Sequence, residues 1–173
     1  MSNKLSKSLG SIVIAAALLA APAVTGSAAG GGTAPAAEFR LTARSGEAVS
    51  LSSLKGRVVL INFWATWCGP CRKEMPLLEQ IQKKYAPLGF TMLGVNVEED
   101  TRLMETFLKD VPVTFPILLD PANGVSKLYD VSAMPSTVIV DRKGNVRFIH
   151  QGYRPGDESK YQDMIRQLIR EKA

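Results

Sequence analysis

The chain has 173 residues, of which 46% are hydrophobic and 21% charged, and its formal net charge is +5. This composition excludes a largely disordered or fibrous chain and fits one globular domain. The lysines and arginines are scattered and are not interleaved with aromatic residues, which argues against a nucleic-acid-binding surface.

The first 29 residues have the pattern of an export signal. Lys4 and Lys7 precede an uncharged run from Leu9 to Val24, and small residues follow, with a cleavage site expected after Ala29. The apolar part is shorter than the roughly 20 residues that a membrane-spanning helix needs. An uncleaved N-terminal anchor is the alternative, and a buried structural helix is the weakest interpretation. In either of the first two cases the protein lies in the periplasm or on the extracytoplasmic side of the membrane.

Residues 30–37 are rich in alanine, glycine and proline and are predicted to form a flexible linker. The domain then occupies residues 38–173. It begins with alternating apolar and polar residues around Ser45 and Gly46, which predict a β-hairpin. The next segment, RVVLINFWA (57–65), is a continuous β-branched and apolar run, typical of a central strand buried on both faces.

The rest of the chain alternates between helical and extended patterns. Helical spacing extends from Cys68 to about Tyr85, residues 90–97 form a second buried strand, and residues 101–109 form a short helix. Three more strands are expected, in FPILLD (115–120), STVIVD (136–141) and VRFIHQ (146–151), and an amphipathic helix closes the chain. The pattern predicts an α/β fold in which a central mixed sheet has helices on both faces and its last two strands are antiparallel.

The only two cysteines, Cys68 and Cys71, lie in the stretch FWATWCGPCRKEMP (63–76). A closed zinc site needs about four ligands, and the chain offers only His150 besides this pair, so no metal is expected. A purely structural disulfide across so short a loop would add little stability. A redox pair is favoured because Cys68 lies where the strand ends and the helix begins. There the free N–H groups and the helix dipole stabilise a thiolate.

This spacing also predicts a mechanism. The Cys68 thiolate attacks a disulfide of a partner, and Cys71 then attacks Cys68 and releases the partner reduced. Gly69 allows a close approach, and Pro70 suits the first position of a helix. Trp67 is expected to shape the surface around Cys68, whereas Trp64 belongs to the core and His150 has no catalytic role.

Three segments of the chain resemble those of a known family, and the resemblance covers residues 38–173. They are LKGRVVLINFWATWCGPCRKEMP, GVNVEED and YDVSAMPSTVIVDRKGNV. Together they are similar to the TlpA/ResA-like group of extracytoplasmic thiol-disulfide oxidoreductases, which have the thioredoxin fold. The Gly-Pro pair between the cysteines resembles the reducing members. The resemblance implies disulfide-containing protein substrates, electrons from a membrane thiol-disulfide relay and a link to cytochrome c maturation. It implies no cofactor beyond the Cys68–Cys71 disulfide, and we expect a monomer.

The resemblance also assigns roles to residues outside the cysteine motif. It implies that the Met134–Pro135 bond is cis and faces the cysteines, where the Met134 backbone pairs with an extended substrate. Thioredoxins bury an aspartate two residues before the phenylalanine of the strand motif, but Ile61 stands there in this chain. Matching GVNVEED to ResA-like members puts proton handling on Glu99, with Glu98 as the neighbouring alternative. An ordinary solvated acid in a loop remains the other interpretation of Glu99.

Two other functions fit a lone cysteine pair. A thiol peroxidase resembles this fold but needs a peroxidatic cysteine in a different setting. A Cu(I)-binding or delivery module would use Cys68 and Cys71 as soft ligands. The methionines are not grouped in a copper-binding motif, so this function ranks below the oxidoreductase.

Overall fold

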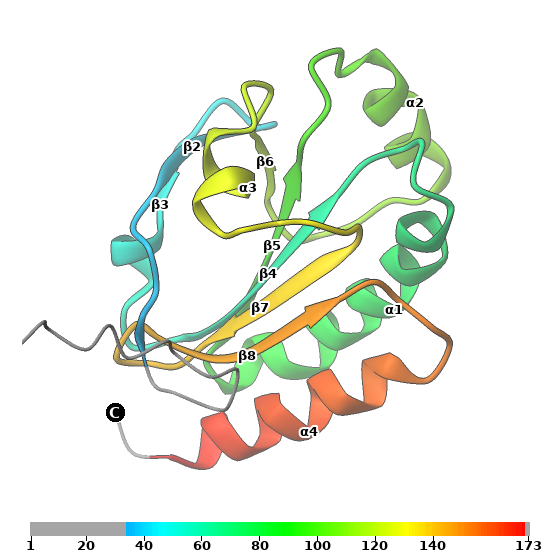
Figure 1. Cartoon of the computed structure of the whole chain (residues 1–173). Coiled ribbons are helices and arrows are strands. Elements are labelled where there is room, and N and C mark those ends of the chain that lie inside the picture. The colour runs from blue at the N-terminus through cyan, green and yellow to red at the C-terminus, as the bar shows by residue number, and fades with distance from the viewer. Residues whose placement is uncertain (1–33, 172–173) are drawn as a thin grey trace, which may run out of the picture.

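The computed structural model describes residues 34–171, so the predicted leader and residues 30–33 lie outside the described residues. Within them, eight strands form one sheet in the order β1-β8-β7-β4-β5-β6-β2-β3 (Figure 1). The strands are β1 (Ala34–Pro35), β2 (Arg40–Ala43), β3 (Ala48–Ser50), β4 (Val58–Trp64), β5 (Phe90–Asn96), β6 (Ile117–Leu119), β7 (Ser136–Val140) and β8 (Asn145–Gln151). The helices are α1 (Gly69–Tyr85), α2 (Arg102–Asp110), α3 (Gly124–Leu128) and α4 (Asp157–Arg170), with short 3₁₀ helices at Leu51–Leu54 and Ala86–Leu88.

Strand β4 lies near the middle of the sheet, parallel to β5 and antiparallel to β7. All seven of its residues are buried, as the continuous apolar run predicts. Because side chains alternate along a strand, Leu60 and Trp64 contribute to the core on one face and Ile61 and Phe63 to the core on the other. The expected antiparallel pairing of the last two strands is also present, between β7 and β8.

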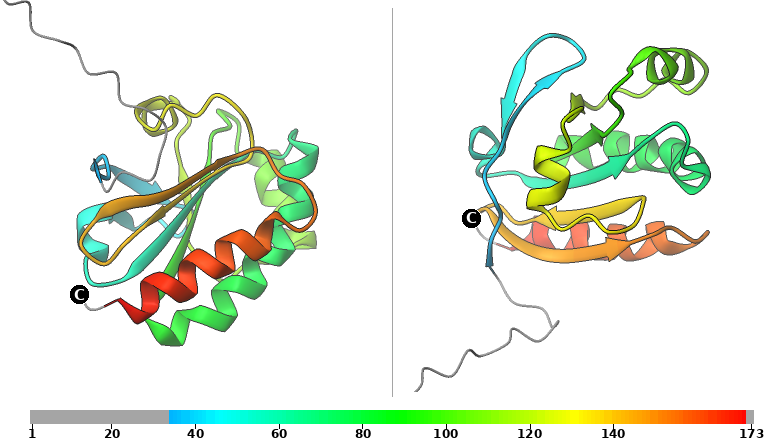
Figure 2. Two further views of the ribbon diagram at one scale, coloured as in Figure 1. Left: turned by 60° about the horizontal axis from the view of Figure 1, so that its bottom comes forward. Right: turned by 45° about the horizontal axis from the view of Figure 1, so that its top comes forward.

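Helices cover both faces of the sheet, as predicted. Helices α1 and α4 run side by side across one face (Figure 2), and residues of α2 join the same core. On the other face, α3 and the segment around the first 3₁₀ helix cover the second core. None of the helices between residues 34 and 171 is long and apolar enough to cross a membrane.

The N-terminal hairpin forms as expected, with β2 and β3 joined through a turn that includes Gly46 at a φ of 91°. The linker differs from the prediction. Ala34 pairs with Val146 in the ladder between β1 and β8, and the Tyr129 hydroxyl donates a 2.6 Å hydrogen bond to the carbonyl of Ala37. Because these contacts satisfy the backbone against the domain, the flexible segment predicted over residues 30–37 does not include residues 34–37.

Helix α3 is an element that the sequence pattern does not predict. Its first turn depends on Asp120, whose Oδ1 accepts the N–H of Gly124 at 2.9 Å and whose Oδ2 accepts the N–H of Ser126 at 2.8 Å. A carboxylate four residues upstream thus satisfies the free donors of the helix start. The helix has five residues, too few for a periodic pattern to be visible.

Gly94 of β5 should be intolerant of any side chain. A Cβ atom there would lie 2.8 Å from Ile117 Cδ1 and 3.0 Å from Phe115 Cε2. We expect Gly94→Ala to lower the free energy of unfolding by about 1–3 kcal/mol, as overpacking of a core does. Urea denaturation would measure this loss. Ile117→Val removes the nearest atom, so the double variant should lose less than the sum of the single losses; strictly additive losses would contradict the steric explanation.

Candidate active site

The two cysteines lie at the end of the central strand, in the turn that leads from β4 into α1. Cys68 is the N-cap residue of α1, and its Sγ accepts a hydrogen bond of 3.2 Å from the N–H of Cys71. The two form a disulfide with a Cα–Cα distance of 5.3 Å. Cys68 is 6% exposed and Cys71 is 1% exposed. The first turn of α1 is therefore placed to stabilise a thiolate at Cys68, and Cys71 is the covered member of the pair.

A groove of about 500 Å³ opens beside Cys68. It is lined by Trp67, Cys68, Gly69, Pro70 and the segment 131–134. Trp67 is 69% exposed, unusual for so large an apolar side chain, whereas Trp64 is fully buried as predicted. The Met134–Pro135 bond is cis, as the resemblance implies. The structure thus brings the four predicted substrate-binding residues together; their contact with a substrate stays a prediction.

Glu98 holds the turn before Trp67 in place by hydrogen bonds to Thr66. Its carboxylate accepts hydrogen bonds from Thr66 N–H at 2.9 Å and from Thr66 Oγ1 at 2.5 Å. The Asn96 side-chain amide donates to the same carboxylate at 2.9 Å. Both oxygens of Glu98 are therefore engaged, and the residue holds the turn before Trp67 against the end of β5.

Glu99 lies in a different environment from its neighbour. Its side chain is exposed, and it is not among the residues that line the groove. An exposed charge acts on a thiol only through a medium that screens it. The predicted role of Glu99 in proton handling stays a prediction.

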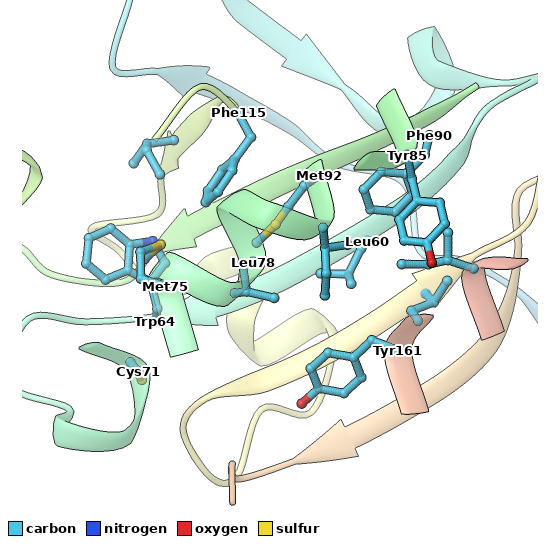
Figure 3. Packing of buried hydrophobic residues seen from close by; sticks show 14 of the residues in the cluster. Leu60, Trp64, Cys71, Met75, Leu78, Tyr85, Phe90, Met92, Phe115 and Tyr161 are labelled. Atoms are coloured by element: carbon cyan, nitrogen blue, oxygen red, sulfur yellow. The ribbon is translucent and has the colours of Figure 1, made fainter. Parts of the chain in front are cut away.

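A third glutamate lies in α1, one helical turn after Cys71, and the sequence motifs did not predict it. Glu74 is fully buried, and its Oε2 accepts a 2.9 Å hydrogen bond from the Asn62 side chain of β4. Asn62 also donates to Thr137 Oγ1 at 3.0 Å. Glu74 is three residues after Cys71 in α1, so the two side chains share one helix face, one turn apart. Figure 3 shows Cys71 at this end of the buried cluster, near Trp64 and Met75.

Burial raises the pKa of Glu74 from 4.5 to about 7. The nearby Tyr161 hydroxyl and the hydrogen bond from Asn62 oppose the rise in the pKa, while the negative charges of Asp157 and Glu158 add to it. A carboxyl with such a pKa can accept and return a proton near neutral pH. Two features of the sequence could have identified it: its spacing from Cys71, and the presence of polar Asn62 in an otherwise apolar strand.

Known proteins share this architecture and motif. The model of the Redoxin family matches residues 29–165. The chain belongs to the redoxin family. This redoxin is 43% identical over 120 residues to the thioredoxin-like protein YneN of Bacillus subtilis, covering 68% of this chain and 69% of that protein. It is 38% identical over 122 residues to the thiol-disulfide oxidoreductase ResA of Geobacillus kaustophilus, covering 70% and 69%.

A solved structure agrees with these sequence relatives. The thiol:disulfide interchange protein DsbE from Chlorobium tepidum superposes on this redoxin with a TM-score of 0.76 at 37% identity, covering 79% of this chain and 96% of that one. The predicted thioredoxin fold and ResA-like resemblance are confirmed. With its Cys68–Cys71 pair, this redoxin is a thiol-disulfide oxidoreductase.

The buried Glu74 carboxyl should make the stability of the oxidised protein depend on pH. Below about pH 4.5 it is protonated in both the folded and the unfolded chain. From there to about pH 7 the unfolded chain loses the proton first, so stability falls as pH rises. The total loss is about 3 kcal/mol, since one pKa unit corresponds to about 1.4 kcal/mol.

Urea denaturation of the oxidised protein between pH 4 and pH 9 would measure this loss. Glu74→Gln should abolish it, whereas Glu99→Gln, at an exposed position, should retain it. Comparing each variant with the wild type removes the contribution of other titrating groups. The same decline in Glu74→Gln would show that the carboxyl is not the group responsible.

Proposed function

We propose that this protein is an exported disulfide reductase, in which Cys68 attacks disulfides of partner proteins and Cys71 resolves the product. The placement of Cys68 carries the proposal. Its sulfur lies at the start of α1, receives the Cys71 N–H, and borders an open groove with an exposed tryptophan. Cys71 is the less exposed of the two, at 1% against 6% for Cys68, and it does not line the groove.

The reaction consists of two thiol-disulfide exchanges. In the first, the Cys68 thiolate bonds to one substrate sulfur, and the other substrate sulfur leaves with the electron pair of the broken bond and takes a proton from solvent. In the second, Cys71 gives its proton to the Glu74 carboxylate and attacks Cys68 Sγ. The Cys68–substrate bond breaks, and the second substrate sulfur leaves as a thiolate. The substrate has gained two electrons, and the protein holds the Cys68–Cys71 disulfide.

A dithiol donor must then return two electrons to the protein. A membrane thiol-disulfide relay fits this role, because the leader pattern in residues 1–29 would place the domain outside the membrane. The relatives named ResA and DsbE support the thiol-disulfide chemistry, and cytochrome c maturation is the process we propose. The cysteine pair is the redox centre by itself, and the protein acts as a monomer without a further cofactor.

The roles of the two cysteines can be separated by trapping. Cys71→Ser should accumulate mixed disulfides with substrate proteins through Cys68, because the resolving thiol is missing. Cys68→Ser should trap nothing and lose turnover entirely. Each variant is purified together with the proteins bound to it, and non-reducing electrophoresis then measures the amount of mixed disulfide. The reverse pattern would exchange the two roles.

Glu99 is tested by the pH dependence of Cys68 alkylation in the reduced protein. A nearby anion opposes formation of a thiolate, so Glu99→Gln should move the midpoint of the iodoacetamide rate profile to lower pH. The shift should be below about one pH unit, since exposed charges are screened. Glu98→Gln, whose carboxylate is bound to Thr66, should shift it less. Equal shifts, or none for Glu99→Gln, would make Glu99 an ordinary solvated acid.

A further inference from the structure

Four buried side-chain polar atoms among residues 34–171 have no hydrogen-bond partner of good geometry: Trp64 Nε1, Arg142 Nε, Oε1 of Glu74 and the hydroxyl oxygen of Tyr161. The Glu74 carboxyl and the Tyr161 hydroxyl belong to one cluster, since the charge of Glu74 acts on the Tyr161 phenol. Both side chains are fully buried. Leaving one such atom unsatisfied costs about 1–3 kcal/mol, so two in one cluster indicate groups that interact with each other.

Tyr161 is held in position by aromatic neighbours. Its ring lies 5.9 Å from that of Phe148 and 5.8 Å from that of His150, edge to face in both pairs. It extends from α4 beneath the sheet, with its hydroxyl pointing toward the end of the core where Cys71 lies (Figure 3). The rotamer of Tyr161 is therefore fixed by packing.

The charges around the pair decide which group donates. Burial and the nearby Glu74 charge raise the pKa of Tyr161, so the phenol keeps its proton and acts as a donor. Thr137 of β7 also lies beside this hydroxyl. Its Oγ1 accepts a hydrogen bond from Asn62 of β4, and Asn62 also donates to Oε2 of Glu74. The Glu74 carboxyl thus lies between an amide from the sheet and a phenol from α4.

The other charged groups that face Glu74 come from the first turns of α4. Lys160, the backbone N–H of Arg154 and His150 of β8 hold the pKa of Asp157 well below its usual range. Asp157 is therefore an anion at neutral pH. Its neighbour Glu158 binds the Tyr153 hydroxyl and the N–H of Gly156. These two anions oppose ionisation of Glu74, whereas a phenol donor favours it.

We propose that the Tyr161 hydroxyl donates a hydrogen bond to Glu74 Oε1 and holds this carboxylate ready to take the proton of Cys71. Tyr161 is then a positioning residue, because it acts on the reacting sulfurs only through Glu74. The inference rests on the role of Glu74 proposed above. Without the phenol, Glu74 retains its proton to higher pH, and the second exchange becomes slow in the range where the wild type is active.

The test uses the oxidised protein and the conservative variant Tyr161→Phe. Infrared difference spectra follow the carbonyl band of the protonated carboxyl as pH rises, and Glu74→Gln identifies that band by its disappearance. In Tyr161→Phe the midpoint should move up by about one pH unit or more, the shift that corresponds to a hydrogen bond to a charged acceptor. Tyr85→Phe is the matched control. It removes another hydroxyl between α1 and α4, one bound to Gln162 and Arg166, and should leave the midpoint unchanged.

An unchanged or lowered midpoint in Tyr161→Phe would overturn the proposal. If that variant does not fold, wild-type protein with ¹³C-labelled tyrosine provides the second measurement. The chemical shift of Tyr161 should change at the pH where Glu74 titrates, and that change should vanish in Glu74→Gln. A chemical shift that stays constant through the titration of Glu74 would overturn the proposal.

These readouts need no turnover, so they separate this inference from the proposed function. Normal turnover of Glu74→Gln would remove Glu74 from the reaction but leave the infrared result on the Tyr161 hydrogen bond standing.

Discussion

Burial of β4 on both faces and both edges is the constraint on which the rest of the structure depends. Every residue of this strand is buried, between two cores and between β5 and β7. A strand held in this way cannot shift, so the turn that follows it has a fixed position. Cys68 is placed in that turn, and α1 must start there to cover the sheet. The reactive sulfur therefore lies on rigid elements although it belongs to a loop.

The same two-sided burial makes a single acid beneath the cysteines chemically useful. Asn62 is a polar side chain in the face of β4 that α1 covers, and it makes the burial of Glu74 tolerable by occupying one of its oxygens. The remaining desolvation raises the pKa of the carboxyl to about 7. The ionised Glu74 carboxylate therefore lowers the stability of the fold, and the same raised pKa allows this carboxyl to exchange a proton near neutral pH. Such a loss of stability is expected at a functional site.

Glu74, Glu98 and Glu99 show how environment divides one residue type into different roles. Glu98 is a structural acceptor, because both its oxygens are bound to the loop before Trp67 and to Asn96. Glu99 faces solvent. Glu74 is enclosed between the sheet, α1 and α4. Only the last of these environments both desolvates the carboxyl and lies one helical turn from Cys71.

The order of strands and helices, the hairpin and the redox pair follow from the sequence itself, because apolar periodicity and the spacing of Cys68 and Cys71 are local properties of the chain. The resemblance to ResA-like proteins rests on the same local segments. Tertiary structure decided which acid is buried, although the spacing of Glu74 from Cys71 and the polar Asn62 are visible in the sequence. Glu74 and Glu99 are equally polar in the sequence, and only the packing of α1 and α4 against Asn62 and Thr137 removes one of them from water. The docking of residues 34–37 and the capping of α3 by Asp120 were decided in the same way, because their partners are fixed by the folded backbone.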